Sequence, residues 1–224
     1  DVSGFTNTDE SAHDIFNIGH TSTSISLASG LAKARDLAGG TENIIAIIGD
    51  GSMSGGEALE GLNVVGEMST NCIMVFNDND QSISENHGGM YRKFKELRET
   101  NGQAEDNLFR AMGLRYRYVA DGNDAEALIR VFSEEKDSTS PVVIHIHTTK
   151  GKGLSFAEND PEGWHRHAPF HLETGIAKKT SSPEPYTAAT VDFVLETARR
   201  NPNFVYLSAG IVGGINLSPA QRAE

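Results

Sequence analysis

Cysteine is almost absent from this sequence. Cys72 is the single one among 224 residues, and it lies inside an apolar run. A disulfide within the chain is therefore excluded, and a reducing compartment such as the cytoplasm is expected. Cys72 itself is predicted to be a core residue.

Long hydrophobic runs and an excess of basic residues are also missing. No apolar stretch approaches the roughly 20 residues that span a bilayer, and no signal peptide is recognisable. Lys and Arg number 19 against 31 Asp and Glu, a formal net charge of -12. This acidity argues against nucleic acid and anionic membranes as partners. The first residue is Asp1 rather than Met, so we expect a trimmed chain or a fragment.

Strand-like and helix-like segments alternate along the first 150 residues. Apolar runs predict strands at 44–48, 72–76, 115–119 and 141–147. Apolar residues at helical spacing predict helices at 22–37, 55–68, 91–99, 105–113 and 124–135. This alternation is typical of βαβ units and predicts an α/β fold with a doubly wound parallel sheet. The β-branched run 44–48 is expected to be a buried strand.

The later part of the chain has a different composition. Residues 148–183 are rich in Gly, Pro and His, and we expect a long functional loop that ends in a linker. A new unit is then predicted, with a helix at 187–200, a strand at 204–208 and a Gly-rich turn at 209–215. We therefore expect one domain over 1–180 and the truncated start of a second α/β domain over 181–224.

Polar residues follow two of the predicted strands, and they are the most informative feature of the chain. Asp50 stands between two glycines after the first strand, and Asn79 closes the run Asn77-Asp78-Asn79 after the second. The carboxyl ends of neighbouring parallel strands form the edge at which open α/β sheets bind ligands. A carboxylate, an amide oxygen and a nearby carbonyl would suit Mg²⁺ that holds a diphosphate. Ordinary turn chemistry remains the alternative.

The Ser/Thr-rich run 19–24 precedes a predicted helix. Free N–H groups there could hold an anion, or Thr21 or Ser22 could simply cap the helix. His20 beside them is an acid–base candidate or an exposed loop residue. His165, in the His-rich run after Trp164, is a second candidate for proton transfer, because imidazole titrates near neutral pH.

Three other patterns are assigned less specific roles. The run TKGKG at 149–153 lacks the Walker pattern, so a Walker nucleotide site is not expected. The His-rich run lacks the spacing and the cysteines of a zinc site. The basic run Arg92–Arg98 is expected to be one solvated helix face, so Arg98→Ala should not abolish ligand binding at the sheet edge.

Taken together, these motifs resemble one family. The runs GHTSTSIS at 19–26, IGDGSMSGG at 48–56 and NDNDQSISEN at 77–86 look like those of 1-deoxy-D-xylulose-5-phosphate synthases. TKGKG at 149–153, Trp164-His165 and ETG at 173–175 continue the resemblance in order. It covers about residues 1–180 and implies the thiamine-diphosphate-binding fold, with thiamine diphosphate and Mg²⁺ as cofactors.

The resemblance also implies roles for individual residues. Asp50 and Asn79 would bind Mg²⁺ through their side chains, and Gln81 through its carbonyl. The residues expected to contact the cofactor are Gly19, His20, Thr21, Gly51, Ser52, Asn79 and Leu154. His20 and His165 are the expected catalytic residues.

The implied reaction joins pyruvate to glyceraldehyde 3-phosphate with loss of CO₂, in a cytoplasmic homodimer. The family's activating glutamate lies in the pyrimidine-binding domain, so this chain alone is expected to turn over little or nothing. Two alternatives stay open: a transketolase-like transfer of a ketol unit between sugar phosphates, and a cofactor-binding subunit that needs a partner chain. Asn123 and Leu154 depart from the family's usual residues and keep the first alternative open.

Overall fold

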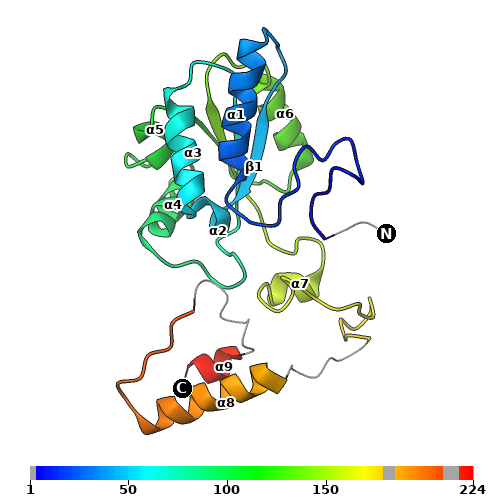
Figure 1. Cartoon of the computed structure of the whole chain (residues 1–224), viewed down its shortest axis with the longest axis vertical. Helices are drawn as coiled ribbons and strands as arrows, with labels where there is room; N and C mark the ends of the chain where they lie inside the picture. The colour runs from blue at the N-terminus through cyan, green and yellow to red at the C-terminus, as the bar shows by residue number, and fades with distance from the viewer. Residues whose placement is uncertain (1–3, 179–184, 209–216, 224) are drawn as a thin grey trace. The chain divides into compact units, whose positions relative to one another are not determined.

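The chain forms two compact units. A computed structural model describes residues 4–178, 185–208 and 217–223. The first unit comprises Asp1–Asn79 and Gly88–Thr148, and the second comprises Asp80–His87 and Thr149–Glu224. The first unit contains the β-sheet and helices α1 to α6, and the second contains α7 to α9 (Figure 1).

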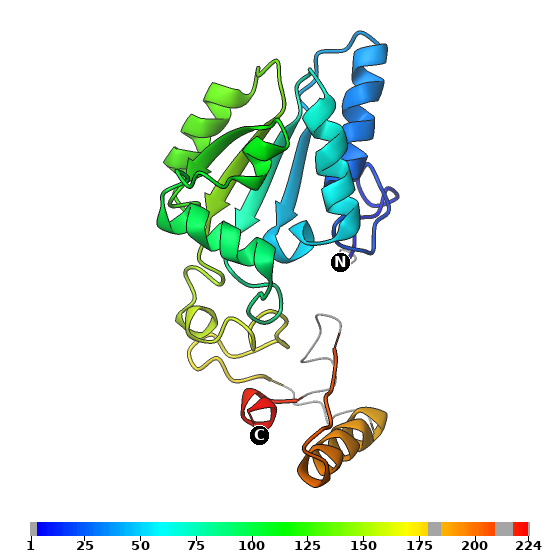
Figure 2. The ribbon, with the colours of Figure 1, turned by 90° about the vertical axis from the view of Figure 1, so that its left-hand side faces the viewer.

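A four-stranded parallel sheet organises the first unit. In spatial order the strands are β1 (Ile45–Gly49), β2 (Ile73–Asp78), β4 (Val142–His147) and β3 (Arg115–Val119). Their carboxyl ends lie at the same edge of the sheet, as the arrowheads in Figure 2 show. The four predicted strands and the parallel α/β class are thus confirmed.

Helices pack on both faces of this sheet. One face contacts α1 (Ser24–Leu37), α3 (Gly56–Glu67), α4 (Gly89–Glu99) and α5 (Leu108–Ala111), while the other contacts α6 (Ala125–Glu135). A one-turn helix, α2 (Asp50–Met53), follows β1 directly. The arrangement is the doubly wound one that the alternating pattern predicts.

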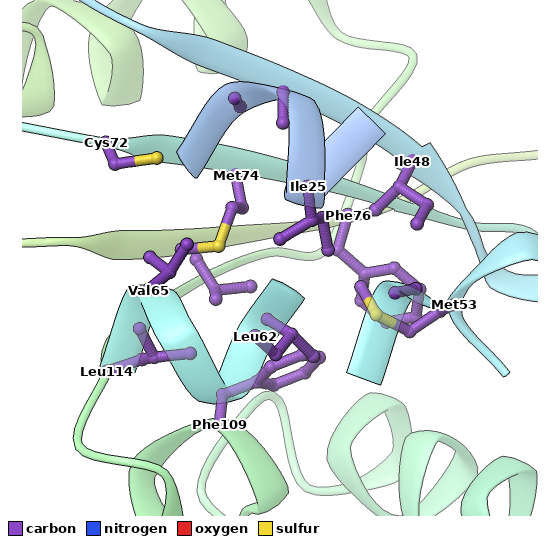
Figure 3. Close-up of a cluster of buried hydrophobic side chains, with 14 of the residues drawn as sticks. Ile25, Ile48, Met53, Leu62, Val65, Cys72, Met74, Phe76, Phe109 and Leu114 are labelled. Carbon is purple, nitrogen blue, oxygen red and sulfur yellow. The ribbon is translucent and has the colours of Figure 1, made fainter. Parts of the chain in front are cut away.

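The larger core lies between the sheet and α1, α3, α4 and α5. Alternate residues of β2, Met74 and Phe76, point into it and meet Leu62 of α3 and Ile25 of α1 (Figure 3). Cys72 belongs to this core as predicted, and burial raises the pKa of its thiol to about 11. Burying a large apolar side chain such as that of Leu62 or Phe76 stabilises the fold by about 1.5–3 kcal/mol.

Strand β1 is covered on one face only. Ala46 and Ile48 are buried in the core, but Ile45 is 56% exposed and Ile47 is 68% exposed. The prediction of a buried strand at 44–48 is therefore wrong for one face within this chain. Because β1 is an edge strand beyond the reach of α6, alternate residues there meet no described helix.

The predicted helix at 105–113 is shorter than expected and begins later. The Asn107 side chain accepts hydrogen bonds from the Phe109 and Arg110 N–H groups, which makes Leu108 the first helical residue. Gly113 follows with a φ of 82°, a left-handed conformation that ends the segment.

The second unit contains three helices among its described residues. They are α7 (Ser155–Asn159), α8 (Pro185–Arg200) and α9 (Pro219–Arg222). Helix α8 confirms the helix predicted at 187–200, whereas residues 204–208 form no strand, so that prediction is wrong. The turn at 209–215 lies outside the described residues. None of the helices that the structure describes is long and apolar enough to cross a membrane.

Truncating a core leucine should destabilise the protein far more than truncating a surface one. Leu62 is fully buried and Leu37 is 79% exposed. We expect Leu62→Ala to lower the free energy of unfolding by about 2–5 kcal/mol, because it leaves a cavity. Leu37→Ala should change it by less than about 0.5 kcal/mol. Denaturant unfolding measures both, and equal losses would contradict the position assigned to the core.

Candidate cofactor and metal site

Asp50 joins the ends of two neighbouring strands. It is the first residue after β1 and is only 2% exposed. Its Oδ1 accepts a hydrogen bond from the Gly51 N–H at 2.6 Å, and its Oδ2 accepts one from the Asn79 N–H at 2.9 Å. Asn79 follows β2 directly, so the prediction that these two strand ends are neighbours is confirmed.

The donors available at this edge are hard oxygens. A buried carboxylate requires hydrogen bonds or positive charge to remain ionised, and the two backbone N–H groups provide part of this for Asp50. A carboxylate together with amide and carbonyl oxygens fits Mg²⁺ rather than a soft metal. The described part of the chain has no cluster of three or more His, Cys, Asp or Glu placed to bind a metal. A metal site made of one carboxylate together with amide and carbonyl oxygens is not a cluster of this kind.

The segment before α1 packs against the region that follows Asp50. A Cβ added to Gly55, which precedes α3, would lie 2.2 Å from the Ser22 Oγ, so only glycine fits there. The alternative that Thr21 or Ser22 caps the helix does not hold, because the N-cap is Thr23 and its side chain makes no capping bond. His20 is exposed, and its Nδ1 lies 2.8 Å from the Thr21 carbonyl oxygen.

Gly51 and Ser52 lie within α2 and are half-buried. Ser54 at the end of this turn donates a hydrogen bond to the Gly51 carbonyl oxygen, and it accepts one from the Tyr91 hydroxyl at 2.7 Å. The first unit therefore places Asp50, Gly51 and Ser52 at the sheet edge, beside the segment that carries Ser22.

The second unit contains the other predicted site residues. Gln81 pairs with Glu85 in an isolated antiparallel bridge, and Leu154 is the N-cap of α7. A Cβ at Gly151 would lie 2.5 Å from that of Ala157, and the φ of Gly151 is 76°, so the glycine of this loop is required for its packing on α7.

His165 lies near a lysine in this same unit. Partial burial and the Lys150 ammonium lower the pKa of the His165 imidazole, while a hydrogen bond with the Ser82 backbone acts in the other direction. Lys150 Nζ donates to the Ser82 carbonyl oxygen at 2.5 Å. A neutral imidazole at pH 7 can accept a proton, which is the property a general base needs.

A buried polar network that sequence reasoning missed lies next to Asn79. The Asp78 carboxylate is fully buried, and its Oδ2 lies 2.7 Å from Arg98 Nη1 and 2.9 Å from His145 Nε2. His145 Nδ1 lies 2.7 Å from the Tyr116 hydroxyl. The alternation of side chains along β2 could have indicated that Asp78 is buried, because it directs Asp78 to the same face as Met74 and Phe76.

Arg98 contradicts the prediction of a solvated helix face. Its side chain is only 10% exposed and pairs with Asp78, whereas Lys95 on the same helix is 63% exposed. Arg98 is therefore not a neutral surface position, and Arg98→Ala is not a valid control for effects on the site.

The charges of this network compensate one another. Burial alone would raise the pKa of Asp78, but hydrogen bonds from His145 and Arg98 outweigh it and lower that pKa to about 2. Burial lowers the pKa of His145, against the effect of Asp78. An ionised Asp78 only accepts hydrogen bonds, so His145 Nε2 carries a proton and the neutral ring accepts the Tyr116 O–H at Nδ1.

Known structures share this fold. Transketolase from Campylobacter jejuni superposes with a TM-score of 0.50 at 22% sequence identity, over 65% of this chain and 22% of that chain. At that level of identity, the similarity establishes the parallel α/β architecture alone.

Known sequences are more similar. The family model for 1-deoxy-D-xylulose-5-phosphate synthase matches residues 1–105 and 98–148. The synthase of Halalkalibacterium halodurans is 38% identical over 96% of this chain and 40% of its own length. That of Chlorobium luteolum is 35% identical over 99% of this chain and 41% of its own length. The chain therefore belongs to the 1-deoxy-D-xylulose-5-phosphate synthase family and spans about 40% of the length of these relatives.

Stability should fall as the pH decreases through about 6.5, the pKa of an unperturbed histidine. The unfolded chain then takes up a proton that buried His145 does not, so acid favours unfolding. Asp78, whose pKa is also lowered, should extend the loss below about pH 3.8. Denaturant unfolding at a series of pH values measures the slope. His145→Gln should flatten the slope near pH 6, and an unchanged slope would contradict a neutral buried His145.

Proposed function

We propose that this chain forms the diphosphate- and metal-binding part of a thiamine-diphosphate-dependent synthase. The reaction condenses pyruvate with glyceraldehyde 3-phosphate to 1-deoxy-D-xylulose 5-phosphate and CO₂. The observation that carries the proposal is the hydrogen bond between the Asp50 carboxylate and the Asn79 N–H, in a chain of this family. It brings the two proposed metal-binding residues together at the sheet edge where such folds bind ligands.

In this proposal, Asp50 and Asn79 bind Mg²⁺ through side-chain oxygens, and Gln81 binds it through its carbonyl. The metal anchors the diphosphate, which Gly51 and Ser52 contact through their backbone and hydroxyl groups. When bound, thiamine diphosphate supplies the electron sink for breaking the bond to the carboxylate of pyruvate. The protein's part is to position the reactants and to move protons.

The two histidines have separate proposed roles. His20, which is exposed before α1, lies beside the reacting end of the cofactor together with Gly19 and Thr21. His165 transfers protons, and its lowered pKa supports a neutral imidazole that can accept one. Leu154 provides an apolar contact to the cofactor.

Larger-scale features are also proposals. Residues 1–180 are proposed to form the diphosphate-binding domain, and 181–224 to belong to the next domain. A cytoplasmic location and a homodimer are proposed on the resemblance to the family. The single cysteine, which is buried, is consistent with a reducing compartment.

Thiamine diphosphate should bind in a metal-dependent way. Calorimetric titration of thiamine diphosphate into the full chain should give binding with Mg²⁺ and none with EDTA. Asp50→Ala should abolish this binding, because it removes the charged ligand of the metal. Asp137→Ala is the matched control, since the Asp137 side chain is 81% exposed. If Asp50→Ala and the parent bound the cofactor equally well, Asp50 would not be a metal ligand.

The donor substrate separates the synthase from a ketol transferase. With thiamine diphosphate, Mg²⁺ and glyceraldehyde 3-phosphate, a polypeptide that joins this chain to a pyrimidine-binding domain should release CO₂ from pyruvate and should not use a ketose phosphate as donor. The 224-residue chain alone should turn over little or nothing. Transfer from a ketose phosphate without CO₂ would favour the transketolase-like alternative. Activity that arises only after a pyrimidine-domain chain is added would favour a subunit that needs a partner.

A further inference from the structure

The last two residues of β2, and Asn79 directly after them, are held in place by different hydrogen bonds. The Asn77 Oδ1 accepts a hydrogen bond from the Thr148 hydroxyl at 2.6 Å. The Asp78 carboxylate binds Arg98 and His145, and the Asn79 N–H donates to Asp50. Successive side chains of a strand point to opposite faces, so the strand end is held from both sides of the sheet and at its tip.

The attachment through Asp78 is the most extensive of the three. It links Arg98 in the last turn of α4, Asp78 at the end of β2, His145 on β4 and Tyr116 on β3. One helix and three strands are thus connected through hydrogen bonds of 2.7–2.9 Å. All four residues belong to the first unit.

Aromatic packing fixes the imidazole at the centre of this network. The Phe76 ring centroid lies 4.6 Å from that of His145, and the Tyr118 ring meets it edge-on at 5.1 Å. His145 is fully buried. The ring therefore has little freedom to rotate, and its Nε2 is directed at Asp78.

Stability alone is a weak explanation for a buried ion pair. Removing a guanidinium and a carboxylate from water is unfavourable, and apolar residues of similar size often give an equally stable core. Charged hydrogen bonds differ from apolar contacts in being directional. The Arg98–Asp78 pair therefore contributes a defined position for the end of β2, the backbone segment that carries Asp78.

We propose that Arg98, together with Asp78, His145 and Tyr116, positions the metal-binding end of β2. This inference rests on the proposed function, in which Asn79 binds Mg²⁺. Asp78 and Asn79 share a peptide unit, and consecutive Cα atoms are about 3.8 Å apart. A shift of the Asp78 side chain therefore moves the Asn79 amide and the N–H that holds Asp50. None of the four network residues needs to contact the cofactor.

Variants of Arg98 test the proposal in the full chain. Calorimetry measures the Kd of thiamine diphosphate and its dependence on Mg²⁺, and denaturant unfolding measures stability separately. Arg98→Met should weaken cofactor binding by roughly 10- to 100-fold, the range seen when residues that orient metal ligands are lost. Arg98→Lys keeps the charge and should recover part of the affinity. Arg92→Met on the same helix is the matched control, because Arg92 is exposed.

A double variant separates positioning from stability. Asp78→Asn with Arg98→Met removes both buried charges at once, so it should be more stable than Arg98→Met alone. We expect its cofactor affinity to stay low, because the directional bond to the strand end is still missing. A double variant that binds the cofactor as tightly as the parent would overturn the proposal. Unchanged affinity in a folded Arg98→Met protein would also overturn it.

Binding by the parent chain separates a failure of the positioning role from a failure of the proposed function. If the parent binds Mg²⁺ and thiamine diphosphate and the variants bind equally well, the positioning role is wrong and the proposed function stands. If the parent itself does not bind them, the proposed function fails, and the positioning role fails with it.

Discussion

The hydrogen bond from the Asn79 N–H to the Asp50 carboxylate is the interaction on which the sheet edge depends. It links the residue that follows β1 to the residue that follows β2, beyond the last backbone pair of the two strands, Gly49 and Asn77. Because Asp50 is almost completely buried, its carboxylate must be satisfied by groups fixed in the protein. The geometry of the two strand ends is therefore set by the requirements of one buried charge.

A second buried carboxylate, Asp78, lies one residue before Asn79, and the protein accommodates it differently. Asp50 accepts hydrogen bonds from backbone N–H groups, whereas Asp78 is paired with the Arg98 side chain. Backbone donors are provided by the strand and helix termini themselves, but the guanidinium depends on the placement of α4. The end of β2 thus depends on packing between α4 and the sheet, through Phe94 and Leu97, as well as on strand pairing.

The sequence predicts the fold well where the physical signal is local. The runs that become β2 and β4 are apolar on both faces because helices cover both faces of the central strands. Edge positions are less predictable: the composition of β1 suits a central strand, yet Ile45 and Ile47 are exposed. The segment 204–208 has strand-like composition, but a strand exists only with a hydrogen-bonding partner, and the described residues provide none.

The polar run Asn77-Asp78-Asn79 shows why the site was only partly predictable. Its composition suits a turn as well as it suits a metal site, and only the neighbouring strand end and the family resemblance favour the second. The role of Asp78 depends on Arg98 and His145, which come from α4 and β4 and are distant in the sequence. The spacing of these residues along the chain does not predict that they contact one another. Alternation along β2 does direct the middle residue of the run into the core, where an unpaired carboxylate would be strongly unfavourable. A buried cation was therefore required near Asp78. The four basic residues of α4 were the nearest candidates in the sequence. Arg98 is the one in the last turn of this helix, and it faces the sheet.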